Sequence, residues 1–218
     1  MALFRKGCIR RSQASLPVFS EGFETGDFSK WSAIPPFGSP YNAVVTTPVH
    51  KGKYAGKLWS DNLNITPLLA KVLPGPRYNT LFYRSFISFI RIPSSIGYLH
   101  RVAEIGRYVG APYWAFVYCP IYVGIGRSSQ TDTTWYWTVN AQFTSLAAVA
   151  NQWYKLKLVS SQQLGRVKAW VDGTLIGEVT ASLSGVTSVG HECYPSGYIS
   201  PNDGFYIDDV AASPIDNI

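Results

Sequence analysis

Phe205-Tyr206-Ile207-Asp208-Asp209-Val210, near the carboxyl end of the chain, is the stretch that decides our interpretation of the fold. Its aromatic and β-branched residues predict a strand with carboxylates at its edge. A second acidic segment, Phe23-Glu24-Thr25-Gly26-Asp27-Phe28, lies near the amino end. The first and last strands of a β-sandwich commonly pair, so we expect these segments to meet. Clustered carboxylates repel one another unless a cation lies among them, and a hard cation with oxygen ligands is the natural candidate.

The composition of the 218 residues fits one β-sandwich domain. Hydrophobic residues make up 46% of the chain, enough for a sizeable core, and all-β domains often reach this length undivided. Charged residues make up only 15%, against roughly 25% in an ordinary soluble domain. Aromatic residues also reach 15%. A surface that is poor in charge and rich in Tyr, Trp, Ser, Thr and Asn suits contact with glycans or with other subunits.

The amino-terminal residues are strongly basic, with Arg5, Lys6, Arg10 and Arg11 close together in a chain of net charge +6. We interpret residues 1–16 as a basic arm, which is either a solvated tail or a segment that binds an acidic partner. That partner is an anionic glycan or a neighbouring subunit, which would make a homo-oligomer or larger assembly; nucleic acid is the least favoured. No apolar run of signal-peptide or membrane-span length is present, so no membrane span is predicted. Cys8, Cys119 and Cys193 are consistent with one disulfide or with none.

Strand-forming runs alternate with turn residues along the rest of the chain, so we predict one all-β domain over residues 17–218. The predicted strands are 17–21, 28–33, 42–47, 54–60, 67–73, 80–91, 98–107, 113–124, 132–143, 153–159, 165–172, 174–180 and 203–213. Asp172-Gly173 is the clearest hairpin turn, because this pair favours positive φ. Residues 145–151 are expected to form one helical turn or a short helix. His191-Glu192-Cys193 is placed in a loop, where adjacent side chains point apart and do not favour a metal.

Alternation along the long strands separates a core face from a polar face. In residues 135–143 the predicted core face is Trp135, Trp137, Val139, Ala141 and Phe143. In residues 165–171 it is Val167, Ala169 and Val171. In residues 98–107 the polar face is Tyr98, His100, Val102 and Glu104. Among the remaining tryptophans, Trp31 and Trp153 are also assigned to the core. One apolar and one polar-aromatic face on each strand predicts a curved antiparallel sandwich with an open concave surface.

Four segments resemble concanavalin A-like jelly rolls, particularly the polysaccharide-lyase-like and laminin-G-like members. The resemblance is carried by Phe19-x-Glu21-Gly22-Phe23-Glu24-Thr25-Gly26-Asp27-Phe28-x-x-Trp31, by residues 50–58, by Trp153-Tyr154-x-Leu156-x-Leu158 with residues 167–173, and by residues 205–210. It implies a single-domain antiparallel β-sandwich of jelly-roll type. Members often hold a structural calcium where the first and last strands meet, and the matching positions are Glu24, Asp27 and Asp209.

The resemblance leaves the activity open, because this fold hosts lectins, hydrolases, lyases and structural modules. Retaining glycosidases need paired carboxylates, and the E-x-D-x-x-E motif of this superfamily is absent. A polysaccharide lyase for an anionic glycan needs a base, an acid and a cation, for which the candidates are His100, Tyr98 and Arg84. The paired Gln-x-His and Arg-x-Glu-x-Arg strands of alginate lyases are missing, so a lyase is the third choice.

We therefore predict a non-catalytic, lectin-like carbohydrate-binding module, displayed on an extracellular or virion surface. Sugar rings stack on aromatic faces, while amides and charges bond their hydroxyls. The candidate binding residues are Trp59, Trp114, Tyr118, Tyr136, Asn140, Gln142, Trp170, His100 and Glu104. The alternative is a structural subunit of an extracellular or viral assembly, of the capsid or decoration type, which binds no ligand.

Overall fold

The computed structural model describes residues 16–32, 41–60, 67–75, 77–91, 97–108, 116–127, 129, 133–180, 186–197, 203–216 and 218. Within strands, the side chains of residues 97–100, 108, 116–120 and 194–197 are not described. The predicted basic arm lies outside these ranges, apart from its last residue. The strands are β1 (Phe19–Glu21), β2 (Asn42–Val45), β3 (Ala55–Ser60), β4 (Leu68–Val72), β5 (Thr80–Phe89), β6 (Gly97–Tyr108), β7 (Phe116–Gly126), β8 (Trp135–Val139), β9 (Gln142–Ala148), β10 (Trp153–Ser161), β11 (Arg166–Val171), β12 (Thr174–Thr180), β13 (Ser188–Glu192), β14 (Tyr194–Gly197) and β15 (Asp203–Ser213).

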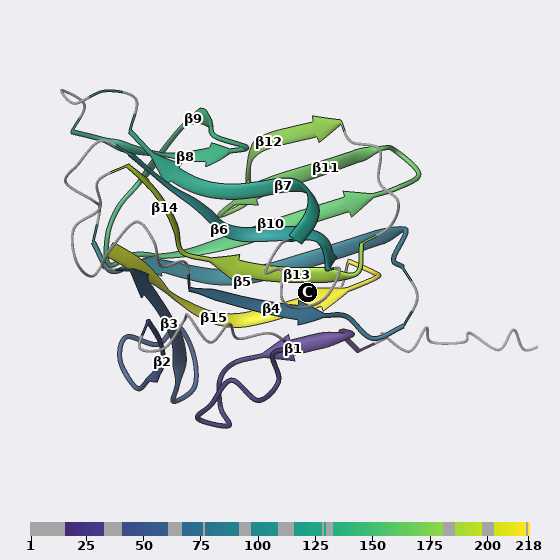
Figure 1. The fold of residues 1–218 in the computed structure, drawn as a ribbon, viewed down its shortest axis with the longest axis horizontal. Coiled ribbons are helices and arrows are strands. Elements are labelled where there is room, and N and C mark those ends of the chain that lie inside the picture. The colour runs from purple at the N-terminus through teal and green to yellow at the C-terminus, as the bar shows by residue number, and fades with distance from the viewer. Residues whose placement is uncertain are drawn as a thin grey trace, which may run out of the picture.

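These strands form two antiparallel sheets packed face to face (Figure 1). Sheet A has the order β12-β11-β10-β5-β15-β3-β2, and β1 pairs with β15. Sheet B has the order β4-β13-β6-β7-β8-β9, and β14 pairs with β6. The predicted all-β antiparallel sandwich is therefore confirmed. No helix in the described part of the chain has the length and apolar character needed to cross a membrane.

The first and last strands pair, as the two acidic segments predicted. In β1, Phe19 lies opposite Ala212 of β15 and Glu21 lies opposite Val210. The register between β15 and β5 shifts after Asp208, and Asp209 has a φ of 46°. Such a bulge bends the strand and redirects side chains, here the carboxylates of Asp208 and Asp209.

The core fills the space between the sheets with residues at alternate strand positions. Val167, Ala169 and Val171 of β11 are fully buried, as predicted, and so is Trp137 of β8. Trp31 and Trp135 are also buried. The assignment of Trp153 to the core was wrong. Alternation along β10 gives the core position to Tyr154 and leaves Trp153 half-buried on the other face of sheet A.

Residues 135–143 form a hairpin and not one strand, which corrects the prediction. Asn140 and Ala141 have φ values of 48° and 62°, the positive pair that a tight two-residue hairpin requires. Phe143 is consequently 38% exposed instead of buried. The helix predicted for residues 145–151 was also wrong, because β9 pairs with β8 and places Ala148 opposite Trp135. Strand pairing has overridden the helical preference of the alanines.

Two further predictions are corrected by the strands. Residues 28–32 contain turns instead of the strand expected there. His191 and Glu192 lie in β13, not in a loop, and β13 pairs with β4 and β6. Cys193 follows directly as a buried free thiol. All three residues are buried in the interior of the domain.

Candidate functional site

The predicted sugar-binding residues are divided between the two sheets. Trp59 and Trp170 lie in β3 and β11 of sheet A. The strands of sheet B carry the larger group: His100, Glu104, Tyr118, Tyr136 and Gln142. Trp114 lies outside the described residues, as do the side chains of His100 and Tyr118. The candidates therefore do not form one site.

Near the middle of sheet B, the described residues that were predicted to face a ligand are buried. Glu104 and Thr138, at positions that alternate with core residues, are both fully buried. Asn140 has a structural role, because its side-chain oxygen accepts a hydrogen bond from the backbone N–H of Tyr122 at 2.9 Å. Tyr136 is half-buried and Gln142 is exposed at the edge. The expected open surface is not present around Glu104.

The lyase candidates are also separated. Arg84 lies in β5 of sheet A, whereas Tyr98 and His100 lie in β6 of sheet B. In β5 the alternate residues Tyr83 and Ser85 are buried, so Arg84 points away from sheet B. The sequence offered Arg84 as a cation near Tyr98 and His100, whereas the structure places Arg84 in the other sheet.

The acidic segments do meet, around Gly22. A Cβ atom at Gly22 would lie 3.8 Å from Cγ of Glu24, 3.9 Å from Oδ1 of Asp208 and 4.0 Å from Oδ1 of Asp209. These carboxylates hold the loop before β3. Oδ2 of Asp208 accepts hydrogen bonds from the backbone N–H groups of His50 at 2.9 Å and Lys51 at 3.0 Å. Burial is the main cause that raises the pKa of Asp208.

Two of the three predicted metal ligands, Glu24 and Asp27, have hydrogen-bond partners of their own. Oε1 of Glu24 accepts a hydrogen bond from the backbone N–H of Lys53 at 3.0 Å. Oδ1 of Asp27 accepts hydrogen bonds from Thr25 and Ser29, and the bond from the Ser29 hydroxyl is the main cause that lowers the pKa of Asp27. In the described ranges no group of three His, Cys, Asp or Glu residues is arranged to hold a metal ion. Calcium at Glu24, Asp27 and Asp209 therefore stays a prediction.

A hydrogen-bonded histidine lies in the interior. Nδ1 of His191 donates to the carbonyl oxygen of Val102 at 2.6 Å, and Nε2 accepts from the hydroxyl of Tyr83. The proton therefore lies on Nδ1 of a neutral ring. Burial lowers the pKa of His191 to about 4 and raises the pKa of Tyr83 well above 10. Because both side chains are fully buried, this pair stabilises the core and has no access to a ligand.

The outer face of sheet A, which points away from sheet B, carries basic and aromatic side chains in register. Trp170 of β11 lies opposite Lys157 of β10, and Lys157 lies opposite Arg84 of β5. On the same face of β10, two residues before Lys157, Lys155 lies opposite Phe86. Neighbouring strands are about 4.8 Å apart, so these side chains form one continuous surface.

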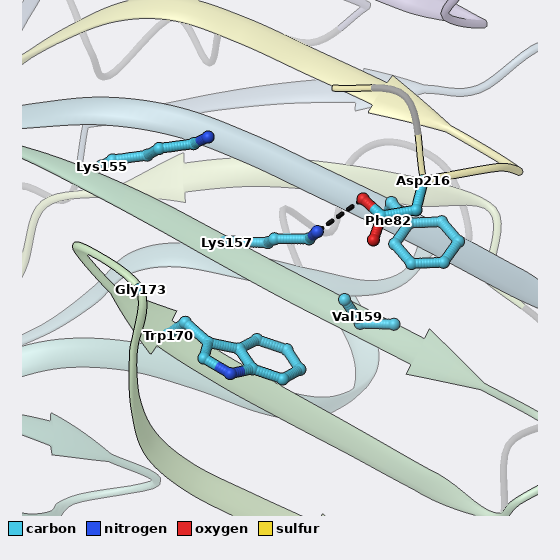
Figure 2. A pocket seen from close by; sticks show the side chains of 7 residues that line it. All are labelled: Phe82, Lys155, Lys157, Val159, Trp170, Gly173 and Asp216. Atoms are coloured by element: carbon cyan, nitrogen blue, oxygen red, sulfur yellow. Dashed lines mark hydrogen bonds and ion pairs between the residues drawn. The ribbon is translucent and has the colours of Figure 1, made fainter.

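A groove of about 430 Å³ lies on this surface (Figure 2). It is lined by Phe82, Lys155, Lys157, Val159, Trp170, Gly173 and Asp216. The register between β11 and β12 shifts between Ala169 and Trp170, where β12 carries one extra residue, and Trp170 keeps the regular alternation of β11. Gly173 has a φ of 82° in the predicted hairpin, and a Cβ there would meet nothing within 4 Å, so the groove is open at that end.

The groove combines an aromatic surface with cations. Nζ of Lys157 lies 2.5 Å from Oδ1 of Asp216 and 5.4 Å from the centre of the Phe82 ring. Lys168, beside the groove, pairs with Glu178 at 3.1 Å. Of the groove residues, the sequence singled out Trp170 as a ligand contact and missed the others. Lys155 and Lys157 are two residues apart in one predicted strand, as are Lys168 and Trp170 in another. This spacing places each pair on one face of its strand and could have indicated a basic surface beside Trp170.

Comparisons with known proteins identify the fold. No protein-family model and no curated protein matches this chain. Among solved structures, a sialidase superposes with a TM-score of 0.62 and 12% identity over 92% of this chain, which spans 19% of the sialidase chain. The cellulose-induced protein Cip1 superposes with a TM-score of 0.58 and 14% identity, and the match covers 90% of this chain and 97% of the Cip1 chain. The alginate lyase Aly36B superposes with a TM-score of 0.53 and 8% identity, and the match covers 91% of this chain and 98% of the lyase chain.

These identities show a common fold and nothing finer. The chain is an all-β sandwich of the concanavalin A-like, jelly-roll type, as its four segments predicted.

Proposed function

We propose that this chain is a non-catalytic carbohydrate-binding module whose sugar site is the groove on the outer face of sheet A. The observation that carries this proposal is the half-buried indole of Trp170 on β11, which lies beside the row of Lys155, Lys157 and Val159 on β10 (Figure 2). An aromatic face stacks on the apolar side of a sugar ring, and nearby ammonium groups bond its oxygens. The groove volume of about 430 Å³ lies within the range of small-ligand sites.

The fold supports a carbohydrate ligand. The solved structures that share it include a sialidase, an alginate lyase and a carbohydrate esterase of a bacteriophage. The proposal includes an extracellular or virion surface as the location, since glycans are met there.

The chemistry of the groove favours binding over catalysis. Its described lining residues contain one carboxylate, Asp216, which is engaged with Lys157, and no histidine. General acid–base catalysis at a glycosidic bond needs two groups that exchange protons near neutral pH. One carboxylate that is already paired with Lys157 does not supply two such groups.

Trp170→Ala tests the proposal. The full chain and the variant are compared on a glycan array, and the affinity for each positive glycan is then measured by calorimetry. We expect Trp170→Ala to weaken binding about tenfold or more, the effect of losing one stacked ring. Trp59→Ala removes another indole of sheet A that the sequence proposed for sugar binding but that lies outside the groove, and it should leave affinity unchanged if the groove is the site. A blank array, or equal losses in both variants, would overturn the proposal.

A further inference from the structure

The ion pair between Lys157 and Asp216 joins a groove strand to the segment that follows β15. The Asp216 carboxylate reaches the Lys157 ammonium beside the Phe82 ring (Figure 2). The Lys157 side chain is 25% exposed and the Asp216 side chain is 53% exposed. Ion pairs with this much contact with water contribute little to stability. A second anion that enters the groove can therefore replace Asp216 at small cost.

The basic side chains around this ion pair outnumber the carboxylates that pair with them. Arg84 and Lys157 are directly opposite on neighbouring strands, and like charges in this position repel each other. Among the described residues, neither Arg84 nor Lys155 has a carboxylate partner. The Nε atom of Arg84 is buried without a hydrogen-bond acceptor. The positive charge that Arg84 and Lys155 place on and beside the groove therefore favours an anionic ligand.

The aromatic side chains restrict which kind of anion suits the groove. Trp170 and Phe82 give the groove two ring surfaces, which a small inorganic anion does not use. An acidic sugar presents both an apolar ring face for the indole and an anion for the cations. A chain of such sugars repeats both features and can span Lys155, Lys157 and Arg84.

We infer that the groove selects polysaccharides bearing carboxylate or sulfate groups, and that one such group takes the place of Asp216 on Lys157. This inference rests on the proposed function and names its ligand class. Asp216 is then an internal competitor, which lowers the affinity of the groove and excludes chains that lack an anion to displace it.

The test compares affinities of the full chain for polygalacturonate, dextran sulfate and neutral dextran at low and physiological salt. Asp216→Asn removes the competitor and should raise affinity for the acidic polymers about fivefold, the size expected for one exposed ion pair. Lys157→Met should lower it about tenfold, and both effects should shrink as salt rises. Polygalacturonate and dextran sulfate distinguish a carboxylate ligand from a sulfate ligand.

Glu178→Gln is the matched control, because it makes the same change in net charge beside the groove without touching Lys157. An affinity gain in Asp216→Asn that exceeds the gain in Glu178→Gln supports displacement. Equal gains show a general charge effect and overturn the inference. Trp170-dependent binding of neutral dextran with the same affinity as the acidic polymers also overturns it but leaves the proposed function intact. Failure to bind any polysaccharide or glycan overturns both.

Discussion

Acidification from pH 7 to pH 4.5 is expected to cost about 2.5 kcal/mol of the free energy of unfolding through His191 alone. The ring is fully buried, with Nδ1 donating to Val102 and Nε2 accepting from Tyr83. A proton added to Nε2 would replace this acceptor with a donor and place a charge in the core. Burial accordingly lowers the pKa of His191 from 6.5 to about 4.

The sign and the size follow from proton linkage. The unfolded chain takes up this proton near pH 6.5, whereas the folded protein takes it up only near pH 4. The stabilisation by neutral His191 is therefore complete above pH 6.5 and falls as the pH falls towards 4. Each pH unit inside this window costs up to about 1.4 kcal/mol, which gives about 2.5 kcal/mol by pH 4.5.

Urea unfolding at several pH values between 7 and 4.5 measures this loss. His191→Asn cannot be charged, so its free energy of unfolding should fall by about 2.5 kcal/mol less than that of the unchanged chain over the same range. Comparison of the two chains removes the contributions of Asp208 and Glu192, whose pKa values burial raises. Tyr83→Phe is the control, because it removes the hydroxyl partner but keeps the imidazole and its pH dependence.

Both substitutions should lower stability at pH 7, by about 1 to 3 kcal/mol, since a buried polar partner is lost. If His191→Asn loses as much free energy on acidification as the unchanged chain, the assignment of the pH dependence to His191 is refuted. An imidazole that titrates near 6.5 in the folded protein, followed by nuclear magnetic resonance, would refute it as well.

Two further predictions concern the ends of the chain where β1, β3 and β15 meet. Gly56→Ala should lower the free energy of unfolding, measured in urea, by about 1 to 3 kcal/mol, because the new Cβ would lie 2.6 Å from Cζ of the Phe23 ring. Gly173→Ala, in the hairpin between β11 and β12, is the comparison. Its new Cβ has open space and only the positive φ opposes it, so this substitution should cost less. For the calcium that the resemblance implies at Glu24, Asp27 and Asp209, the sequence predicts a higher midpoint of thermal unfolding with calcium than with a chelator, and no difference in Asp209→Asn. Equal midpoints in the unchanged chain would exclude this metal.

Local patterns were sufficient for most strands. The alternation of Val167, Ala169 and Val171 identified a core face, because a strand repeats every two residues whatever its neighbours are. Asp172-Gly173 identified a hairpin because its preference for positive φ is a property of the two residues themselves. Asn140-Ala141 carried a weaker preference, so the hairpin between β8 and β9 was missed.

The site depended on information that no short segment contains. Alternation shows that Arg84 shares a face of its strand with Phe82, but it does not show that β5 belongs to sheet A while His100 belongs to sheet B. The groove needs β5, β10 and β11 side by side, and it needs Asp216 to approach Lys157 from a segment 59 positions away. The sequence by itself determined the strands, their buried faces and the meeting of the two ends, since periodicity and turn preference act over a few residues. Only the tertiary structure decided which exposed faces adjoin, because pairing between distant strands is set by the packing of the whole core.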